Sequence, residues 1–408
     1  MRVTAILFLL VAATCATSLM AQEEPSLTII AIGDAGEANK FLRANAGLMS
    51  DMLSGRHDAG KYSSVIFLGN NFYTTGLNVP ADDVDGKIKS VLGPFRDIAE
   101  HLGRTNIHAI PGNHDYYRRN AIEASLLFGL VSVEEAPVGL AERGNEREAA
   151  IPDWTYHYKM PAEVCYAIPE SGDSVQFLFV DTALPLRTDP RTWREPLDSL
   201  YRLLLKSAAH PGVRWRILCM HHPWYSVGQH GGYTIWNDET NRVEYLTNCD
   251  KDSNAVQWLK NWLDPEDLCT EKYHAYVDSV RQVLHHAAVR INLTLAAHDH
   301  SLQLLFGMTH DTNCHICPRT HLISGAGCLP THVKLPHPPD EYTSPEPEVR
   351  KKGVSQPGFA QLKFTSSAIR IVFFNGMSGD RIDMGGGRDE FWLNPDGALI
   401  ERPPQSTQ

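Results

Sequence analysis

Two histidine-bearing segments carry the residue types best suited to metal chemistry. Cys219-Met220-His221-His222-Pro223 follows an apolar run at residues 216–219, and Ala297-His298-Asp299-His300 follows one at residues 293–297. Neutral imidazole is the commonest nitrogen ligand for metals in proteins. In an open α/β sheet, ligands bind beyond the carboxyl ends of the strands, so we expect these histidines at such an edge.

Three other short apolar runs also end in loops with ligand-capable side chains. The loops are Gly33-Asp34-Ala35-Gly36 after residues 27–32, Gly69-Asn70-Asn71-Phe72-Tyr73 after residues 64–68, and Pro111-Gly112-Asn113-His114-Asp115 after residues 107–110. One such junction is an ordinary turn, whereas their recurrence along the chain indicates a composite site.

The candidate metal ligands in these loops are oxygen and nitrogen donors: Asp34, Asn70, Tyr73, Asn113, His221, His298 and His300. This mixed set suits a pair of borderline metals better than calcium, which prefers all-oxygen cages. Two such ions, about 3.5–4 Å apart, can clamp a phosphoryl group and activate water. His114 and His230 are further imidazoles that could bind a phosphate or protonate a leaving alkoxide.

Each of these residues also has a simpler structural interpretation. A single histidine at a strand end is usually hydrogen-bonded within the fold, which is the interpretation we give to His222, His285, His286 and His321. An isolated Asp or Asn in such loops commonly stabilises a turn, and an isolated Tyr packs in the core. The joint pattern favours metal ligation for the candidate set.

The alternation of expected strands and helices predicts an α/β fold. Helices are expected at residues 37–54, 84–102, 118–130, 196–207 and 271–288, and further strands at residues 155–160, 176–180, 215–219, 291–296, 302–306, 320–323, 358–364 and 368–375. Residues 132–153 have the pattern of an irregular insertion, and residues 231–250 and 332–352 that of long loops. The strand-rich end indicates a second sheet.

Charge and the N-terminal residues limit the classes of partner and compartment. The net charge is −11, without a run of Lys or Arg, which argues against a nucleic-acid partner. Residues 1–21 have the pattern of a signal peptide, with Arg2 before an apolar stretch and then small residues. We therefore expect a secreted protein, or one in the endomembrane or lysosomal lumen.

The cysteines fit an oxidising compartment. Of eight cysteines, Cys15 would leave with the signal peptide, so at least one of the remainder has no disulfide partner. Cys219, in an apolar strand, is the expected free thiol. The expected disulfide formers lie in loop-like sequence: Cys249, Cys269, Cys314, Cys317 and Cys328.

The ordered motifs resemble those of the calcineurin-like metallophosphoesterases. They are Gly-Asp-x-Gly at residues 33–36, Gly-x-Asn-Phe-Tyr at 69–73, Gly-Asn-His-Asp at 112–115, His-x-Pro at 221–223 and His-x-His at 298–300. Tyr73 in its motif, the segment His221-His222-Pro223-Trp224-Tyr225-Ser226 and Ser324-Gly325-Ala326-Gly327 resemble the purple, or tartrate-resistant, acid phosphatases. The resemblance covers residues 27–375.

This resemblance implies a fold, two metal ions and an activity. The fold would be two packed mixed β-sheets flanked by helices, with the domain at residues 25–376 and a C-terminal extension at residues 377–408. Iron(III) would be bound by Asp34, Tyr73 and His300, and a divalent iron, zinc or manganese by Asn113, His221 and His298. Metal-bound hydroxide would hydrolyse phosphate monoesters at acidic pH, on a phosphorylated small molecule or phosphoprotein. His114 and His230 match the substrate-binding and acid histidines.

One position departs from the family pattern. Asn70 stands where the family has the Asp that bridges the two metals, and a neutral amide offers one good oxygen donor and no charge. Metal binding and activity are therefore expected to be weakened. The alternative interpretation is a catalytically impaired acid-phosphatase-like protein that acts as a binding or membrane-complex scaffold with a protein partner. A lumenal protein phosphatase or nucleotide hydrolase is a third possibility.

Overall fold

The computed structural model describes residues 27–56, 62–74, 76, 84–102, 106–115, 165–170, 175–210, 212–230, 234–237, 242–245, 268, 270–306, 316–331, 333, 351–365, 367–385 and 387–402. The strands of the first sheet are β1 (Leu27–Ile32), β2 (Tyr62–Phe67), β3 (Ile107–Ala109), β13 (Gly358–Phe364), β14 (Ile369–Asn375), β15 (Glu390–Leu393) and β16 (Leu399–Ile400). Those of the second sheet are β4 (Cys165–Glu170), β5 (Val175–Val180), β6 (Trp215–Met220), β9 (Leu293–Ala296), β10 (Leu302–Phe306), β11 (Thr320–Ser324) and β12 (Lys351–Val354).

Both sheets are mixed, and each has a parallel segment that carries the candidate site. In the first sheet the order is β16-β15-β14-β13-β1-β2-β3, with β1, β2 and β3 parallel to one another. In the second sheet the order is β12-β10-β11-β9-β6-β5-β4, with β11, β9, β6 and β5 parallel. Carboxyl ends of parallel strands meet at one edge, so the loops that follow them gather there.

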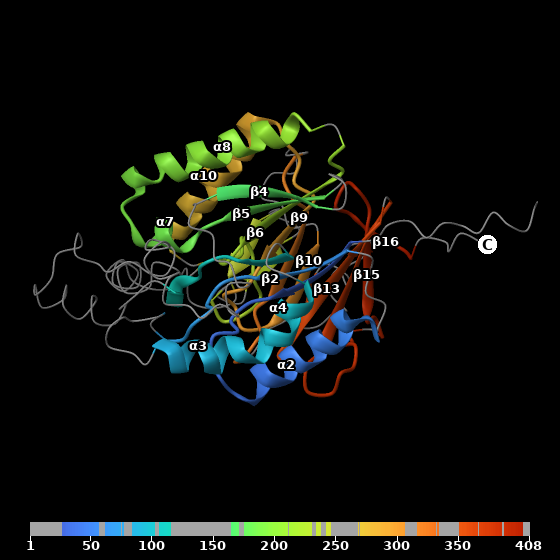
Figure 1. Ribbon diagram of the computed structural model, residues 1–408. Helices are drawn as coiled ribbons and strands as arrows, with labels where there is room; N and C mark the ends of the chain where they lie inside the picture. Colours follow the sequence, from blue (N-terminus) through green and yellow to red (C-terminus); the bar gives the residue numbers. More distant parts are fainter. Residues whose placement is uncertain are drawn as a thin grey trace, which may run out of the picture.

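Helices cover the outer face of each sheet (Figure 1). The helices are α2 (Lys40–Asp51), α3 (Val84–Leu92) and α4 (Arg96–Leu102) against the first sheet, and α7 (Ala183–Arg187), α8 (Arg194–Ala208) and α10 (Glu271–Ala287) against the second. Side chains alternate across β1: Ile29 packs between the two sheets, and Ile30 packs under the helices. The result is a four-layer arrangement, helix, sheet, sheet and helix, which confirms the expected fold class.

The structure refines several expected elements. The helix expected at residues 84–102 is divided by a short 3₁₀ turn at Gly93–Phe95, where Pro94 cannot donate a backbone hydrogen bond. The expected loop at residues 231–250 contains a hairpin of β7 (Thr234–Asn237) and β8 (Arg242–Tyr245). Strand β4 was not anticipated, and β15 and β16 extend the first sheet from within the expected C-terminal extension. The predictions for residues 1–21, 118–130, 132–153 and 155–160 lie outside the described residues.

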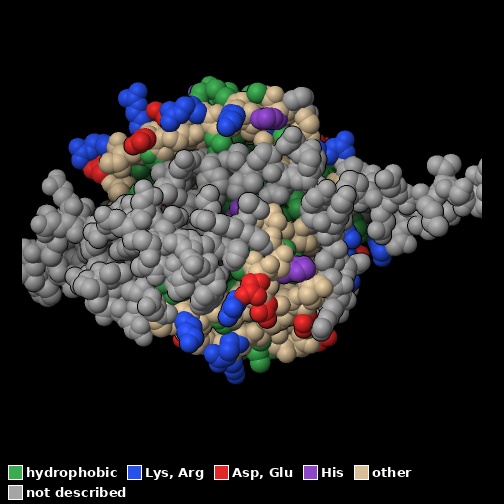
Figure 2. All heavy atoms as spheres, viewed as in Figure 1, with side chains coloured by type: hydrophobic (Ala, Val, Ile, Leu, Met, Phe, Trp, Pro, Cys, Tyr) green, Lys and Arg blue, Asp and Glu red, His purple; other side chains and the backbone are tan. Residues whose placement is uncertain are grey.

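The surface charges, the helices and the cysteines can be compared with the expectations from the sequence. In the view of Figure 2, positive and negative side chains are interspersed over the helical layers. None of the helices in the described ranges has the length and apolarity of a membrane span. Cys219 is free and buried, as expected, and Cys317 forms a disulfide bond. The prediction for Cys328 was wrong: it is a buried free thiol whose Sγ donates to the carbonyl oxygen of Asp34 at 2.8 Å.

Candidate metal centre

Backbone hydrogen bonds hold the site loops of the two sheets together at their shared edge. The N–H of Gly33 donates to the carbonyl of Ser324 at 2.7 Å and joins the two sheets. Within the first sheet, the N–H of Asp34 donates to the carbonyl of Gly69 at 3.0 Å, and within the second, the N–H of Ala297 donates to that of His221 at 2.9 Å. The candidate residues therefore belong to one cross-linked edge.

The first group of candidate ligands converges on Asp34. Tyr73 donates its hydroxyl to Oδ1 of Asp34 at 2.8 Å, and its oxygen lies 2.9 Å from Nε2 of His300. Nε2 of His300 lies 3.5 Å from the same Oδ1. The second carboxylate oxygen, Oδ2, accepts the backbone N–H of His298 at 2.8 Å. The structure thus brings together the three residues predicted to bind iron(III).

Asn70 fills the space beside this group with hydrogen-bond donors. Its Nδ2 donates to Oδ1 of Asp34 at 2.7 Å and to the hydroxyl oxygen of Tyr73 at 3.2 Å. Its Oδ1 accepts the backbone N–H of His114 at 2.8 Å. A backbone N–H can only donate, so it fixes which end of the amide is the oxygen. An NH₂ group therefore faces the Asp34 carboxylate and the Tyr73 hydroxyl.

The second group lies at the ends of β3, β6 and β9. Nδ1 of His221 lies 2.7 Å from the carbonyl of Leu68, and its Nε2 lies 3.0 Å from Oδ1 of Asn113. The carbonyl accepts only, so Nδ1 donates its proton there, and this directs Nε2 toward the Asn113 side chain. Within the described part of the chain, the buried Nε2 of His298 has no hydrogen-bond partner. A buried imidazole nitrogen without a hydrogen-bond partner, beside a second imidazole, fits a bound divalent cation.

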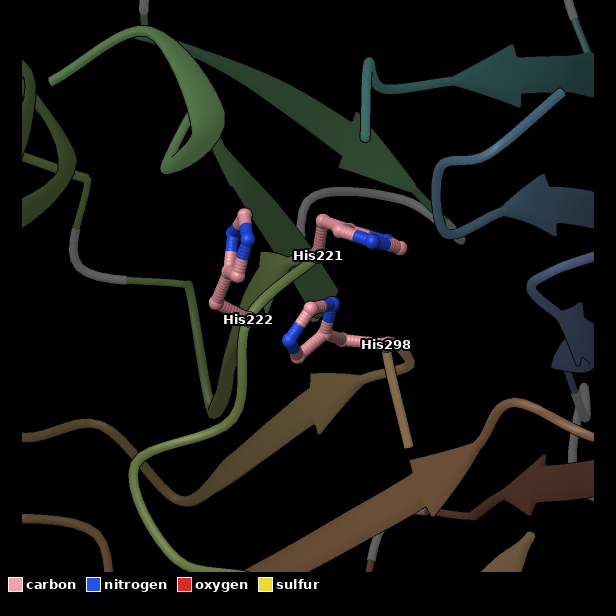
Figure 3. A group of neighbouring side chains, drawn as sticks. All are labelled: His221, His222 and His298. Atoms are coloured by element: carbon pink, nitrogen blue, oxygen red, sulfur yellow. The ribbon is translucent and has the colours of Figure 1, made fainter. Parts of the chain in front are cut away.

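His222 adds a third imidazole to this second group. His221, His222 and His298 each offer a ligand atom within 4.8 Å of the others, and all three are buried (Figure 3). The hydroxyl of Thr182 lies 2.8 Å from Nδ1 of His222 and fixes this ring. Sequence reasoning assigned His222 a structural role only. Its position directly beside His221 in the sequence was the one signal that could have marked it.

Burial and neighbouring charges shift the pKa values of Asp34, Tyr73 and His298. Burial raises the pKa of Asp34, but the charge of His300, together with hydrogen bonds and His221, outweighs this and holds it well below its usual range. Burial, and then the charge of Asp34, raises the pKa of Tyr73 well above its usual value, so the phenol keeps its proton. Burial, and then neighbouring imidazoles, lowers the pKa of His298, which keeps its ring neutral and able to bind a metal.

Asp115 joins the second and third loops, and sequence reasoning gave it no role. Its Oδ1 accepts the backbone N–H groups of Asn71 and Phe72 at 2.8 and 3.0 Å. Its Oδ2 accepts the N–H of Gly112 at 2.8 Å and Nδ2 of Asn71 at 3.0 Å. The carboxylate is 1% exposed. It therefore sets the position of Asn70 relative to Asn113.

His114 lies beside Tyr73 and His230 lies beside His298, and both are partly exposed. The His114 ring lies 4.6 Å from that of Tyr73, centroid to centroid, and its Nδ1 lies 2.6 Å from the carbonyl of Thr74. The His230 ring lies 4.3 Å from that of His298. The backbone N–H of His230 donates to buried Asp299 at 2.8 Å. Both imidazoles therefore border the candidate ligands and are partly accessible to solvent.

Three site residues adopt left-handed backbone conformations that non-glycine residues rarely adopt. The φ angles are 52° at Asp34, 54° at Asn70 and 68° at His298. Such outliers persist where surrounding contacts fix the chain, and they concentrate at functional sites. Here they direct the side chains of the loops toward the common edge.

Comparison with known proteins decides the family. The model of the calcineurin-like phosphoesterases matches residues 27–301. The chain belongs to this family. The match covers every residue of the first and second groups, and the family implies divalent metal ions and hydrolase chemistry.

Solved structures share the fold at low sequence identity. The purple acid phosphatase PPD1 from yellow lupin (Lupinus luteus) seeds is 12% identical, with a TM-score of 0.52 over 91% of this chain and 54% of that one. GAP50, the anchor in the inner membrane complex of Plasmodium, is 15% identical, with a TM-score of 0.50 over 88% of each chain. No curated protein sequence matches the chain. At this identity the structures establish a shared architecture.

Proposed function

We propose that this chain is a metal-dependent phosphatase that hydrolyses phosphate monoesters at acidic pH. The observation that carries the proposal is the second group of ligands: Nε2 of His221 lies 3.0 Å from Oδ1 of Asn113, and the His298 ring lies 5.2 Å from that of His221. The buried Nε2 of His298 has no hydrogen-bond partner among the described residues. The resemblance of the motifs to purple acid phosphatases supports the reaction class. The substrate would be a phosphorylated small molecule or a phosphoprotein, met in a secretory or lysosomal compartment.

Each residue of the site would have a separate role in the proposed hydrolysis. Asn113, His221 and His298 would hold a divalent ion, which supplies Lewis acidity at the phosphoryl group. The Nδ1 proton of His114 is held by the carbonyl of Thr74, which directs Nε2 to bind a phosphate oxygen. His230, fixed through its backbone by Asp299, would protonate the leaving alkoxide.

The test is p-nitrophenyl phosphate hydrolysis across pH by wild type, His298→Ala and His321→Ala. His321 is the matched control, because it is also buried and its Nδ1 lies 2.7 Å from the hydroxyl of Thr294, away from the ligand groups. We expect His298→Ala to lose at least the roughly 10–100-fold that loss of an outer-sphere metal partner costs. His321→Ala should keep turnover per folded molecule. Equal turnover by wild type and His298→Ala would exclude the proposal.

A second candidate function is a binding scaffold without turnover, and Asn70 is the observation that favours it. Its amide places donors where the family requires a bridging carboxylate. GAP50, which shares this architecture, is the anchor in the inner membrane complex of Plasmodium. Under this alternative, wild type would lack turnover at every pH even when loaded with metal. Turnover gained by Asn70→Asp would then attribute the loss to this one residue.

A further inference from the structure

The carboxylate of Asp34 already has hydrogen-bond donors on both of its oxygens. The carboxylate is fully buried, and a buried anion requires compensating donors. Oδ1 accepts from Nδ2 of Asn70 and from the Tyr73 hydroxyl, and Oδ2 accepts from the backbone N–H of His298. The chain itself therefore supplies the partners that a metal ion would otherwise provide.

The Asn70 amide cannot readily turn its oxygen toward this group. Rotation by half a turn would place NH₂ against the backbone N–H of His114, which now donates to Oδ1 at 2.8 Å. Two donors would then face each other in a buried site, with one hydrogen bond lost. Both N–H groups of Nδ2 are already engaged by Asp34 and Tyr73, and an amide nitrogen has no lone pair for a cation.

The second group of candidate ligands has a different environment from that of Asp34. Nε2 of His221 lies 3.0 Å from Oδ1 of Asn113, and His221, His222 and His298 each offer a nitrogen atom within 4.8 Å of the others. The buried Nε2 of His298 has no hydrogen-bond partner among the described residues.

We infer that hydrogen bonds from Asn70 replace the ion at Asp34, Tyr73 and His300, and that the chain binds a single divalent ion, at Asn113, His221 and His298. The inference concerns the metal content of the site proposed above and does not depend on turnover. It departs from the two-ion centre that the family resemblance implies.

Metal stoichiometry tests the inference directly. Purified wild type and Asn70→Asp are stripped with chelator, loaded with zinc, freed of excess ion and analysed by elemental mass spectrometry. We expect about one ion per chain in wild type and about two in Asn70→Asp, since aspartate restores a bridging carboxylate. His298→Ala should lose the single ion. Two ions per wild-type chain, or one in Asn70→Asp, would overturn the inference.

Iron(III) gives an independent optical readout. A tyrosinate bound to iron(III) absorbs visible light, so Asn70→Asp loaded with iron(III) should be coloured and wild type should be colourless. The double variant Asn70→Asp, Tyr73→Phe should be colourless, which assigns the band to Tyr73. A coloured wild-type protein whose band disappears in Tyr73→Phe would contradict the inference even if Asn70→Asp failed to fold.

Thermal unfolding separates a restored metal site from a merely buried new charge. In chelator, Asn70→Asp should unfold at a lower temperature than wild type, because two carboxylates would meet where Nδ2 now donates to Asp34. Metal should reverse that loss. Asn45 is the matched control: it is also fully buried, and its Nδ2 donates to the carbonyl of Gly327 at 2.8 Å. Asn45→Asp should be destabilised without rescue, and equal rescue of both variants would refute the inference.

The outcomes also distinguish this inference from the proposed function. One ion per wild-type chain without turnover would support the inference and contradict the proposed phosphatase activity. Two ions per wild-type chain with turnover would contradict the inference and support the phosphatase activity.

Discussion

Replacement of Asp115 by Asn should unfold the protein at much lower denaturant concentration. The substitution keeps the shape of the side chain but replaces one acceptor oxygen by NH₂. Each carboxylate oxygen now accepts two N–H groups, so two buried donors would face an NH₂ group. At about 1–3 kcal/mol for each unsatisfied buried donor, the expected loss is roughly 2–6 kcal/mol of unfolding free energy.

The assay is urea denaturation in chelator, followed by tryptophan fluorescence, with Asp383→Asn as the matched control. Asp383 is exposed, although it too accepts two backbone N–H groups, from Gly385 at 2.8 Å and Gly387 at 3.2 Å. Water can replace those bonds, so we expect a change in unfolding free energy within about 0.5 kcal/mol. If both variants lost the same stability, burial of the Asp115 network could not be the cause, and the reasoning would fail.

Two further predictions concern a site glycine and a distant ion pair. Gly112→Ala should destabilise the protein and disturb the site, because a Cβ there would collide with the backbone and side chain of Asn70. Gly47→Ala, at an exposed helical position with open space around it, should instead raise the unfolding free energy by about 0.5–1 kcal/mol. Urea denaturation midpoints of the two variants test this difference. Burial of Glu390 would raise its pKa, but hydrogen bonds from Arg370 at 2.9 and 2.7 Å outweigh this and lower it. Its stabilising contribution should therefore be present above the unfolded-state pKa, near 4.3, and disappear as the pH falls through the lower folded value. Thermal melts from pH 7 to pH 3 should show wild type losing its advantage over Glu390→Gln, and a constant difference would contradict the assignment.

The sequence was sufficient for the strand junctions but not for their hydrogen bonds. Short apolar runs bounded by Gly and Asn predicted β1, β2 and β3, because buried strands and tight turns have distinct compositions. The grouping of Asp34 and Tyr73 with His300 came from family resemblance, since spacing cannot show which loops meet across two sheets. The amide orientation of Asn70 depends on a backbone N–H 44 positions away, at His114, and no local pattern encodes it.

Burial also explains what sequence composition could not predict. Cys328 lies in loop-like sequence, which favours an exposed disulfide, yet the loop packs under the site and its thiol donates to Asp34. His222 was assigned a structural role, and its contact with Thr182 fits that assignment. Its proximity to His221 and His298 arises because β6 and β9 are neighbours in the sheet, although more than seventy residues separate them in the chain.

The position of β1 in the middle of the first sheet has a consequence for how the chain must fold. β1 pairs with β2 on one side and with β13 on the other, so its partners lie near both ends of the chain. The family match ends at residue 301, before β13 begins, and a fragment that stopped there would leave one edge of a fully buried strand unpaired. During synthesis, β1 must wait for more than three hundred later residues before its sheet can close. Such long-range pairing makes folding slow, and the unpaired edge in the nascent chain is an aggregation hazard that a chaperone would have to cover.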